Sequence, residues 1–80
     1  MRKSIHTTQQ KRLLALLRDL RLESGLTQAD LGSRIQKDQT FISKYESGER
    51  RLDILELRAL CGAIGISLEE FARRLEKALK

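Results

Sequence analysis

The sequence has no proline, a single cysteine, Cys61, and a single histidine, His6. One cysteine can form no disulfide within the chain and cannot supply the several thiolates of a structural zinc site. Because unpaired cysteine is typical of a reducing compartment, we expect a cytoplasmic protein. His6 has no second candidate ligand nearby, so we expect no bound metal. Nothing else in the sequence indicates a cofactor or a small-molecule ligand.

Long apolar runs are also missing. No stretch approaches the roughly 20 apolar residues of a membrane-spanning helix, and the N-terminal sequence MRKSIHTTQQ lacks the apolar core of a signal peptide. The alternation of polar and apolar residues that is typical of strands is absent. The chain shows no nucleophile with its base and acid, no glycine-rich phosphate loop and no paired-carboxylate site. We therefore expect no membrane partner and no enzymatic activity.

The composition is that of a small folded domain with an uneven charge distribution. Of the 80 residues, 40% are hydrophobic and 34% are charged, and the formal net charge is +5. Residues 1–21 hold six lysines and arginines against a single aspartate, whereas the signs nearly cancel from Leu22 onward. A basic chain favours polyanionic partners, but charge this far towards the N-terminus does not by itself identify a nucleic-acid-binding surface.

Hydrophobic spacing predicts an all-α chain of five helices. One buried helical stripe, with apolar residues at i, i+3, i+4 and i+7, predicts a helix from residue 7 or 8 to 24. Its members are Leu13, Leu16, Leu17 and Leu20. Four more helices are predicted over about 28–35, 39–47, 54–63 and from 68 towards the C-terminus. We expect residues 1–6 to form a flexible N-terminal arm and residues 7–80 to form a single domain.

Each of the last four helices is preceded by a residue that can cap it. A capping side chain accepts a hydrogen bond from the first helical turn, and an acidic residue three places on can return the bond. The capping residues are Thr27, Asp38, Asp53 and Ser67. The expected reciprocal partners are Asp30 for Thr27, Glu56 for Asp53 and Glu70 for Ser67.

Residues 27–51, TQADLGSRIQKDQTFISKYESGERR, indicate two short helices joined by a tight turn and followed by a basic loop. Ile42 and Tyr45 face inward on the second helix, and Gly48 can end it in a left-handed conformation. Four polar residues remain on the outward face: Gln39, Thr40, Ser43 and Lys44. Two short helices at a steep angle, the second with a polar outer face, form the pattern that places side chains in the DNA major groove.

The helix that starts at residue 39 also lacks a hydrophobic staple, which pairs an apolar residue before the cap with another in the first turns of the helix. The other three have candidate pairs: Leu26 with Leu31, Leu52 with Leu57, and Ile66 with Phe71. At residue 39 the pair is Lys37 with Ile42. Chance can explain one missing staple; the alternative is that this helix begins at a surface that faces solvent or a ligand.

From about Leu17 to Phe71 the sequence resembles the Cro/repressor-type (XRE-like) helix-turn-helix family. The order and spacing of the matching residues carry the resemblance: Arg21, Gly25-Leu26-Thr27-Gln28, Leu31, Ile35, Ile42, Glu46-x-Gly48, Arg50-Arg51 and Gly65-Ile66-Ser67. The resemblance implies a five-helix, lambda-repressor-like fold with the helix-turn-helix at the second and third helices. It also implies a DNA-binding function.

Three positions depart from the family pattern. Gln36 stands where the turn usually has glycine, so it has to adopt a left-handed conformation or the turn has to differ. Gly32 replaces the usual alanine, and Leu52 stands where proline is common. None of the three lies on the outward face of the 39–47 helix, so they bear on turn geometry more than on function.

The resemblance implies that the outward face of the 39–47 helix contacts bases. Gln39 and Thr40 match positions that reach base edges, and a glutamine can pair with N6 and N7 of adenine. Lys44 and Ser43 lie on the same face and can reach a base or a phosphate. The alternative for all four is an ordinary solvated surface.

Phosphate contacts are implied for residues at both ends of the motif. Thr27 and Gln28 begin a helix whose N-terminus can face a phosphate, while Arg50 and Arg51 follow the 39–47 helix and are expected to fix its register on DNA. Phe41 lies to the side of that helix and packs either at the edge of the core or against the DNA backbone or thymine methyls.

The resemblance further implies a structural ion pair between Arg21 and Glu46 that joins the first and third helices. Arginine suits this role because its fork can bind both oxygens of a carboxylate. Arg21 is therefore not expected to contact DNA.

The last helix carries an apolar stripe that the core of so small a domain cannot easily bury along its whole length. Its residues are Leu68, Phe71, Ala72, Leu75, Ala78 and Leu79. We predict that Leu68, Leu75 and Leu79 lie in the interface of a twofold homodimer, formed by this helix with help from the 54–63 helix. Such symmetry places two copies of the 39–47 helix about 34 Å apart, one turn of DNA.

Together these observations predict a sequence-specific DNA-binding transcriptional regulator, a repressor or autoregulator, that acts as a homodimer on a palindromic operator in double-stranded DNA. The alternative is a protein-interaction module of the same fold, such as an antitoxin-like protein or accessory subunit, with weak or no DNA binding. The small net charge around the 39–47 helix keeps that alternative open.

Overall fold

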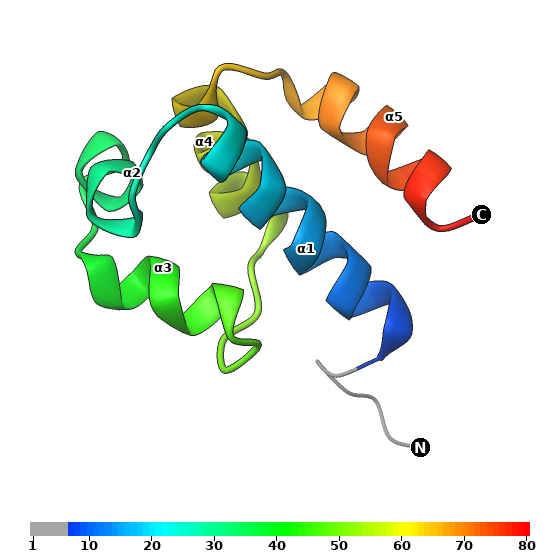
Figure 1. Ribbon diagram of the computed structural model, residues 1–80, viewed down its shortest axis with the longest axis horizontal. Coiled ribbons are helices and arrows are strands. Elements are labelled where there is room, and N and C mark those ends of the chain that lie inside the picture. Colours follow the sequence, from blue (N-terminus) through cyan, green and yellow to red (C-terminus); the bar gives the residue numbers. More distant parts are fainter. Residues whose placement is uncertain (1–6) are drawn as a thin grey trace.

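The computed structural model describes residues 7–80, which form five α-helices (Figure 1). They are α1 (Thr8–Glu23), α2 (Gln28–Arg34), α3 (Gln39–Glu46), α4 (Ile54–Ile64) and α5 (Leu68–Ala78). Their number matches the prediction, and their ends differ from it by only one or two residues. The expected arm over residues 1–6, which includes His6, lies outside the described residues.

Capping side chains fix where each helix begins. Thr27 and Asp30 form a reciprocal capping box at α2, and Asp53 and Glu56 form another at α4. Ser67 accepts a hydrogen bond from the backbone N–H of Glu70 over 3.0 Å at the start of α5. The predicted reciprocal bond between Glu70 and Ser67 is wrong, because the Glu70 carboxylate pairs with Arg73 and Arg74 on its own helix instead.

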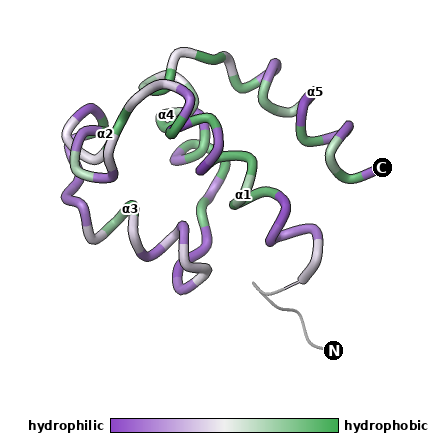
Figure 2. Tube along the Cα trace, in the orientation of Figure 1, coloured by the Kyte–Doolittle hydropathy of each residue, from purple (hydrophilic) through white to green (hydrophobic). Residues whose placement is uncertain are grey.

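Every helix contributes to one hydrophobic core. Each helix carries both hydrophobic and hydrophilic residues along its length (Figure 2), and the apolar faces meet in a cluster of Leu14, Leu17, Leu20, Leu26, Leu31, Ile42, Tyr45, Leu60, Cys61 and Phe71. The Cys61 side chain is fully buried, and this burial raises the pKa of its thiol to about 11. Cys61 is therefore a small core residue rather than a reactive thiol.

The packing order places the helix-turn-helix at one end of the molecule. α2 packs against α3 and α4, and α1 packs against α3 and α5, so α1 runs through the middle with α2 and α3 on one side and α5 on the other (Figure 1). Two arginines hold helix C-termini: Arg12 Nη1 donates to the carbonyl of Ala78 over 2.5 Å, and Arg34 Nη1 donates to the carbonyl of Ala63 over 3.0 Å. Among residues 7–80, no helix is long and apolar enough to cross a membrane.

Candidate nucleic-acid interface

The turn between α2 and α3 depends on the backbone geometry at Gln36 and at Gly32. Gln36 adopts the left-handed conformation, with a φ of 61°, so glutamine takes the backbone geometry that glycine adopts most easily. Gly32, in contrast, lies where a Cβ would come within 2.9 Å of the carbonyl oxygens of Lys37 and Asp38. The backbone N–H of Lys37 donates to the Gly32 carbonyl over 2.8 Å and holds the turn in this close approach.

α3 divides into a buried face and an exposed face. Ile42 and Tyr45 are fully buried against the core. The four residues expected to contact bases are all exposed: Gln39, Thr40, Ser43 and Lys44. Asp38 caps the helix by accepting from the backbone N–H of Phe41 over 3.0 Å, so the exposed polar residues begin at the first turn. This surface is open to a ligand.

A chain of side-chain hydrogen bonds connects the first residue of α3 to the interior. Gln39 Nε2 donates to Gln28 Oε1 over 3.3 Å, and Gln28 Nε2 donates to Glu46 Oε1 over 3.1 Å. Gln28 therefore bridges the exposed start of α3 and a carboxylate near its end. From the sequence, Gln28 is expected only to contact a phosphate. Its bridging role could not be predicted, because hydrogen bonds between separate helices leave no periodic signal in the sequence.

Arg21 and Glu46 form a bidentate ion pair between α1 and α3. Arg21 Nε lies 2.7 Å from Glu46 Oε2, and Nη2 lies 3.1 Å from Oε1. The side chains of Arg21 and Glu46 are only 8% and 7% exposed. Arg21 Nη1 also donates to the carbonyl of Leu26 over 2.8 Å. The hydrogen bond with Glu46 raises the pKa of Arg21, so the Arg21 guanidinium stays charged although it is nearly buried.

The residues expected to contact phosphates lie in different environments. Thr27 and Arg51 are exposed, and Gln28 is half-buried. The backbone N–H of Thr27 already donates to Asp30 over 3.0 Å, as part of the capping box. The hydrogen bonds that Asp30 accepts from Thr27 lower the pKa of the Asp30 carboxyl, so a negative charge lies at the start of α2. Phosphate binding at this helix end stays a prediction.

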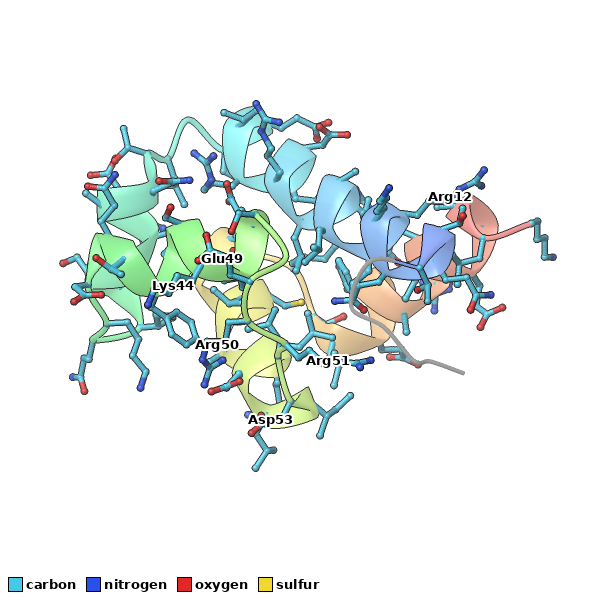
Figure 3. The ribbon with its side chains drawn as sticks, turned by 90° about the horizontal axis from the view of Figure 1, so that it is seen from below. Arg12, Lys44, Glu49, Arg50, Arg51 and Asp53 are labelled. Atoms are coloured by element: carbon cyan, nitrogen blue, oxygen red, sulfur yellow. The ribbon has the colours of Figure 1, made fainter. Side chains whose placement is uncertain are left out.

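Arg50 is tied into the fold more closely than its sequence position indicates. Its Nη1 and Nη2 donate to both carboxylate oxygens of Glu56 over 2.9 Å and 2.7 Å, and Nη1 also donates to the carbonyl of Arg51 over 2.9 Å. The guanidinium carbon lies 4.6 Å from the centroid of the Phe41 ring. The ion pair with Arg50 lowers the pKa of Glu56 to about 2. Lys44, Arg50 and Arg51 lie on the side of the molecule seen in Figure 3, next to α3 and the start of α4.

Phe41 packs at the edge of the core, which was one of the two alternatives for it. Its ring meets the Tyr45 ring edge to face, with centroids 6.0 Å apart at 67°. Lys37 Nζ lies 5.4 Å from the Phe41 centroid and Arg50 lies 4.6 Å from it. The Phe41 ring thus makes cation–π contacts with both Lys37 and Arg50 beside α3.

Comparison with known proteins agrees with this geometry. The family described as "Helix-turn-helix" matches residues 17–71. The control protein C.MunI from Mycoplasma sp is 32% identical over 62 residues, which cover 76% of this chain and 84% of that protein.

Two solved structures are similar over nearly the whole chain. An XRE-family like protein from Pseudomonas syringae pv. tomato str. DC3000 is 37% identical, with a TM-score of 0.86, over 95% of this chain and 93% of that one. The restriction-modification controller protein C.Esp1396I, as a tetramer in complex with its natural 35 base-pair operator, is 30% identical, with a TM-score of 0.83, over 94% of this chain and 100% of that one.

The fold and the site define a helix-turn-helix protein with an exposed polar α3. The chain belongs to the XRE-like helix-turn-helix family, whose members bind DNA as regulators, and the predicted lambda-repressor-like fold is confirmed. It is similar in particular to the controller proteins of restriction-modification systems.

Proposed function

We propose that this protein is a sequence-specific transcriptional regulator of the controller type, a repressor or autoregulator that binds a palindromic operator as a homodimer. The observation that carries the proposal is the exposed start of α3, where Gln39 is held by Gln28 and through it by the buried Glu46. The similarity to C.MunI and to a controller crystallised on its operator supports the same function. A regulator of this kind acts by occupancy in the cytoplasm and performs no catalysis.

The expected contacts with DNA follow from which side chains of α3 and its neighbouring residues are exposed. Gln39 and Thr40 read base edges at the first turn of α3, and Ser43 and Lys44 extend that surface by one turn. Backbone phosphates lie against Thr27, Gln28, Arg50 and Arg51, with Phe41 supporting Arg50. Because lysines and arginines displace counterions from DNA, the affinity falls steeply as salt rises.

The homodimer uses α5 together with α4. Leu68, Leu75 and Leu79 are each half-buried in one chain, which leaves apolar surface for a second copy. α4 offers more, because Ile54 is 63% exposed and Leu55 is 72% exposed. Large apolar side chains this exposed favour an interface, and neither was singled out from the sequence.

The test is selection of bound duplexes from a random-sequence library, combined with light scattering of the free protein. We expect the recovered duplexes to share an inverted repeat with half-sites about one helical turn apart, and the free protein to have the mass of two chains. Recovery of unrelated sequences with no common element would contradict the function and favour the protein-interaction module. The mass of one chain would contradict the dimer alone.

A further inference from the structure

The Arg50 guanidinium has one occupied edge and one open edge. Three of its N–H groups are used: one Nη1–H and one Nη2–H bind Glu56, and the second Nη1–H binds the Arg51 carbonyl. No residue among 7–80 accepts a hydrogen bond from Nε–H or from the second Nη2–H. These two donors share the other edge of the same planar group, and the side chain is 41% exposed.

Arg21 shows what that open edge can hold. Arg21 uses its own Nε and Nη2 to bind the two oxygens of Glu46 at 2.7 Å and 3.1 Å. Two oxygens of a phosphate present the same pair of adjacent acceptors, which an arginine binds with two parallel hydrogen bonds. An arginine can therefore hold a carboxylate on one edge and a phosphate on the other.

Three contacts keep the Arg50 guanidinium in one orientation. Glu56 binds one edge, the guanidinium carbon lies over the Phe41 ring, and the Arg51 carbonyl accepts from the second Nη1–H. Glu56 is in turn fixed, because its Oε1 also accepts from the backbone N–H of Asp53 over 3.0 Å at the start of α4. A long side chain that is already held loses little rotational freedom when it binds a ligand.

We propose that Glu56 is a positioning residue for DNA binding, which holds Arg50 so that its open Nε–Nη2 edge receives a backbone phosphate. The inference rests on the proposed function and adds to it an acidic residue that strengthens the binding of a polyanion. The ion pair with Arg50 holds the pKa of Glu56 at about 2, so its carboxylate stays charged throughout the neutral range. A carboxylate near DNA ordinarily weakens binding by repulsion. Removing the charge of Glu56 therefore lowers the Kd if Glu56 only repels DNA, and raises the Kd if Glu56 positions Arg50.

The decisive variant is Glu56→Gln, measured by fluorescence anisotropy on the selected operator and on a random duplex. Glutamine keeps one oxygen that can accept from the Asp53 N–H, so the cap of α4 is retained, and a thermal melt checks the fold. The glutamine side chain lacks the second carboxylate oxygen that fixes Arg50. We expect the Kd to rise by about two- to tenfold on both duplexes, the cost of ordering one long side chain.

Glu49→Gln is the matched control. Glu49 lies next to Arg50 in the loop between α3 and α4 and accepts from Ser47 Oγ over 2.9 Å, but no arginine among residues 7–80 pairs with it. Removing its charge is expected to leave the Kd unchanged or to lower it. Glu56→Gln is also made in an Arg50→Ala background, where we expect no further rise in Kd, because Glu56 acts only through Arg50.

Each other outcome has a definite meaning. A Kd for Glu56→Gln that is unchanged or lower would overturn the proposal, as would an equal effect in the Arg50→Ala background. A loss confined to the operator would overturn the phosphate as the acceptor and place a base edge there. A wild-type protein that binds neither duplex would overturn the proposed function itself, which is a distinguishable failure.

Discussion

Gln28 and Gln39 are joined through their side-chain amides, with Gln39 Nε2 donating to Gln28 Oε1 over 3.3 Å. This contact links the first residue of α2 to the first residue of α3. Gln28 also donates to Glu46, so the orientation of an exposed glutamine depends on a carboxylate that is nearly buried. A base-reading side chain that is held before it meets DNA loses less conformational freedom on binding.

Replacing Gln28 by alanine is expected to weaken operator binding although its side chain need not touch a base. The substitution frees Gln39, which must then be ordered on binding at a cost of about 0.5–1.5 kcal/mol, or a roughly two- to tenfold higher Kd. Gln9→Ala, an exposed change on α1, serves as the control and is expected to bind like the wild type. Anisotropy titration against the operator measures both, and equal affinities for the two variants would contradict the positioning role.

Breaking the Arg21–Glu46 pair is expected to destabilise the fold. Removing one partner leaves the other charge nearly buried and unpaired, which costs about 3–5 kcal/mol of the free energy of unfolding when the pair is fully buried. Either Arg21→Ala or Glu46→Ala is therefore expected to lower the midpoint of urea unfolding strongly. Arg73→Ala removes an arginine from an exposed pair on α5 and is expected to change the midpoint little. Equal shifts for Arg21→Ala and Arg73→Ala would show that the inner pair contributes no more than a surface pair.

Two glycine-to-alanine substitutions are expected to have opposite effects. At Gly32 the new Cβ meets two backbone carbonyl oxygens at 2.9 Å, so Gly32→Ala should lower the free energy of unfolding by about 1–3 kcal/mol through overpacking. At Gly62, inside α4, a Cβ has nothing within 4 Å, so Gly62→Ala should raise it by about 0.5–1 kcal/mol. Calorimetry of both variants decides the matter; a stabilised Gly32→Ala protein would mean that the turn relaxes more easily than its geometry indicates.

If the protein dimerises through α4 and α5, its mass in solution and its operator affinity depend on the apolar residues of these two helices. Leu55→Asp and Leu79→Asp are each expected to yield the mass of a single chain by light scattering at micromolar concentration, with weaker operator binding. Leu22→Asp is the control, since Leu22 is 53% exposed on α1 and is not part of the proposed interface. If Leu22→Asp alone produced a monomer, the interface would lie on α1 instead.

Local signals in the sequence were enough to predict the helices. Thr27, Asp38, Asp53 and Ser67 each accept a hydrogen bond from their own first turn, and such bonds depend only on residues three places apart. The prediction failed where two local partners compete. Glu70 could return the bond to Ser67, but it pairs with Arg73 and Arg74 instead, and spacing alone does not rank these choices.

The candidate site was predictable only in part. The exposed face of α3 follows from helical periodicity, because Ile42 and Tyr45 fix which side is buried. The links from Gln28 to Gln39 and from Glu56 to Arg50 join separate elements, so their existence depends on how the helices pack. Glu56 was identified from the sequence only as the partner of Asp53, a role that it also performs.

Gln39 is the residue on which base reading by α3 most depends, so the operator affinity of a Gln39→Ala variant tests the proposed function most directly. The Kd of Gln39→Ala is compared with that of Arg51→Ala on the selected operator and on a random duplex. Gln39→Ala is expected to lose about 1–3 kcal/mol of binding on the operator alone, the discrimination of one paired base contact, whereas Arg51→Ala is expected to weaken both duplexes equally. A Gln39→Ala protein that still prefers the operator as strongly as the wild type would contradict base reading by α3.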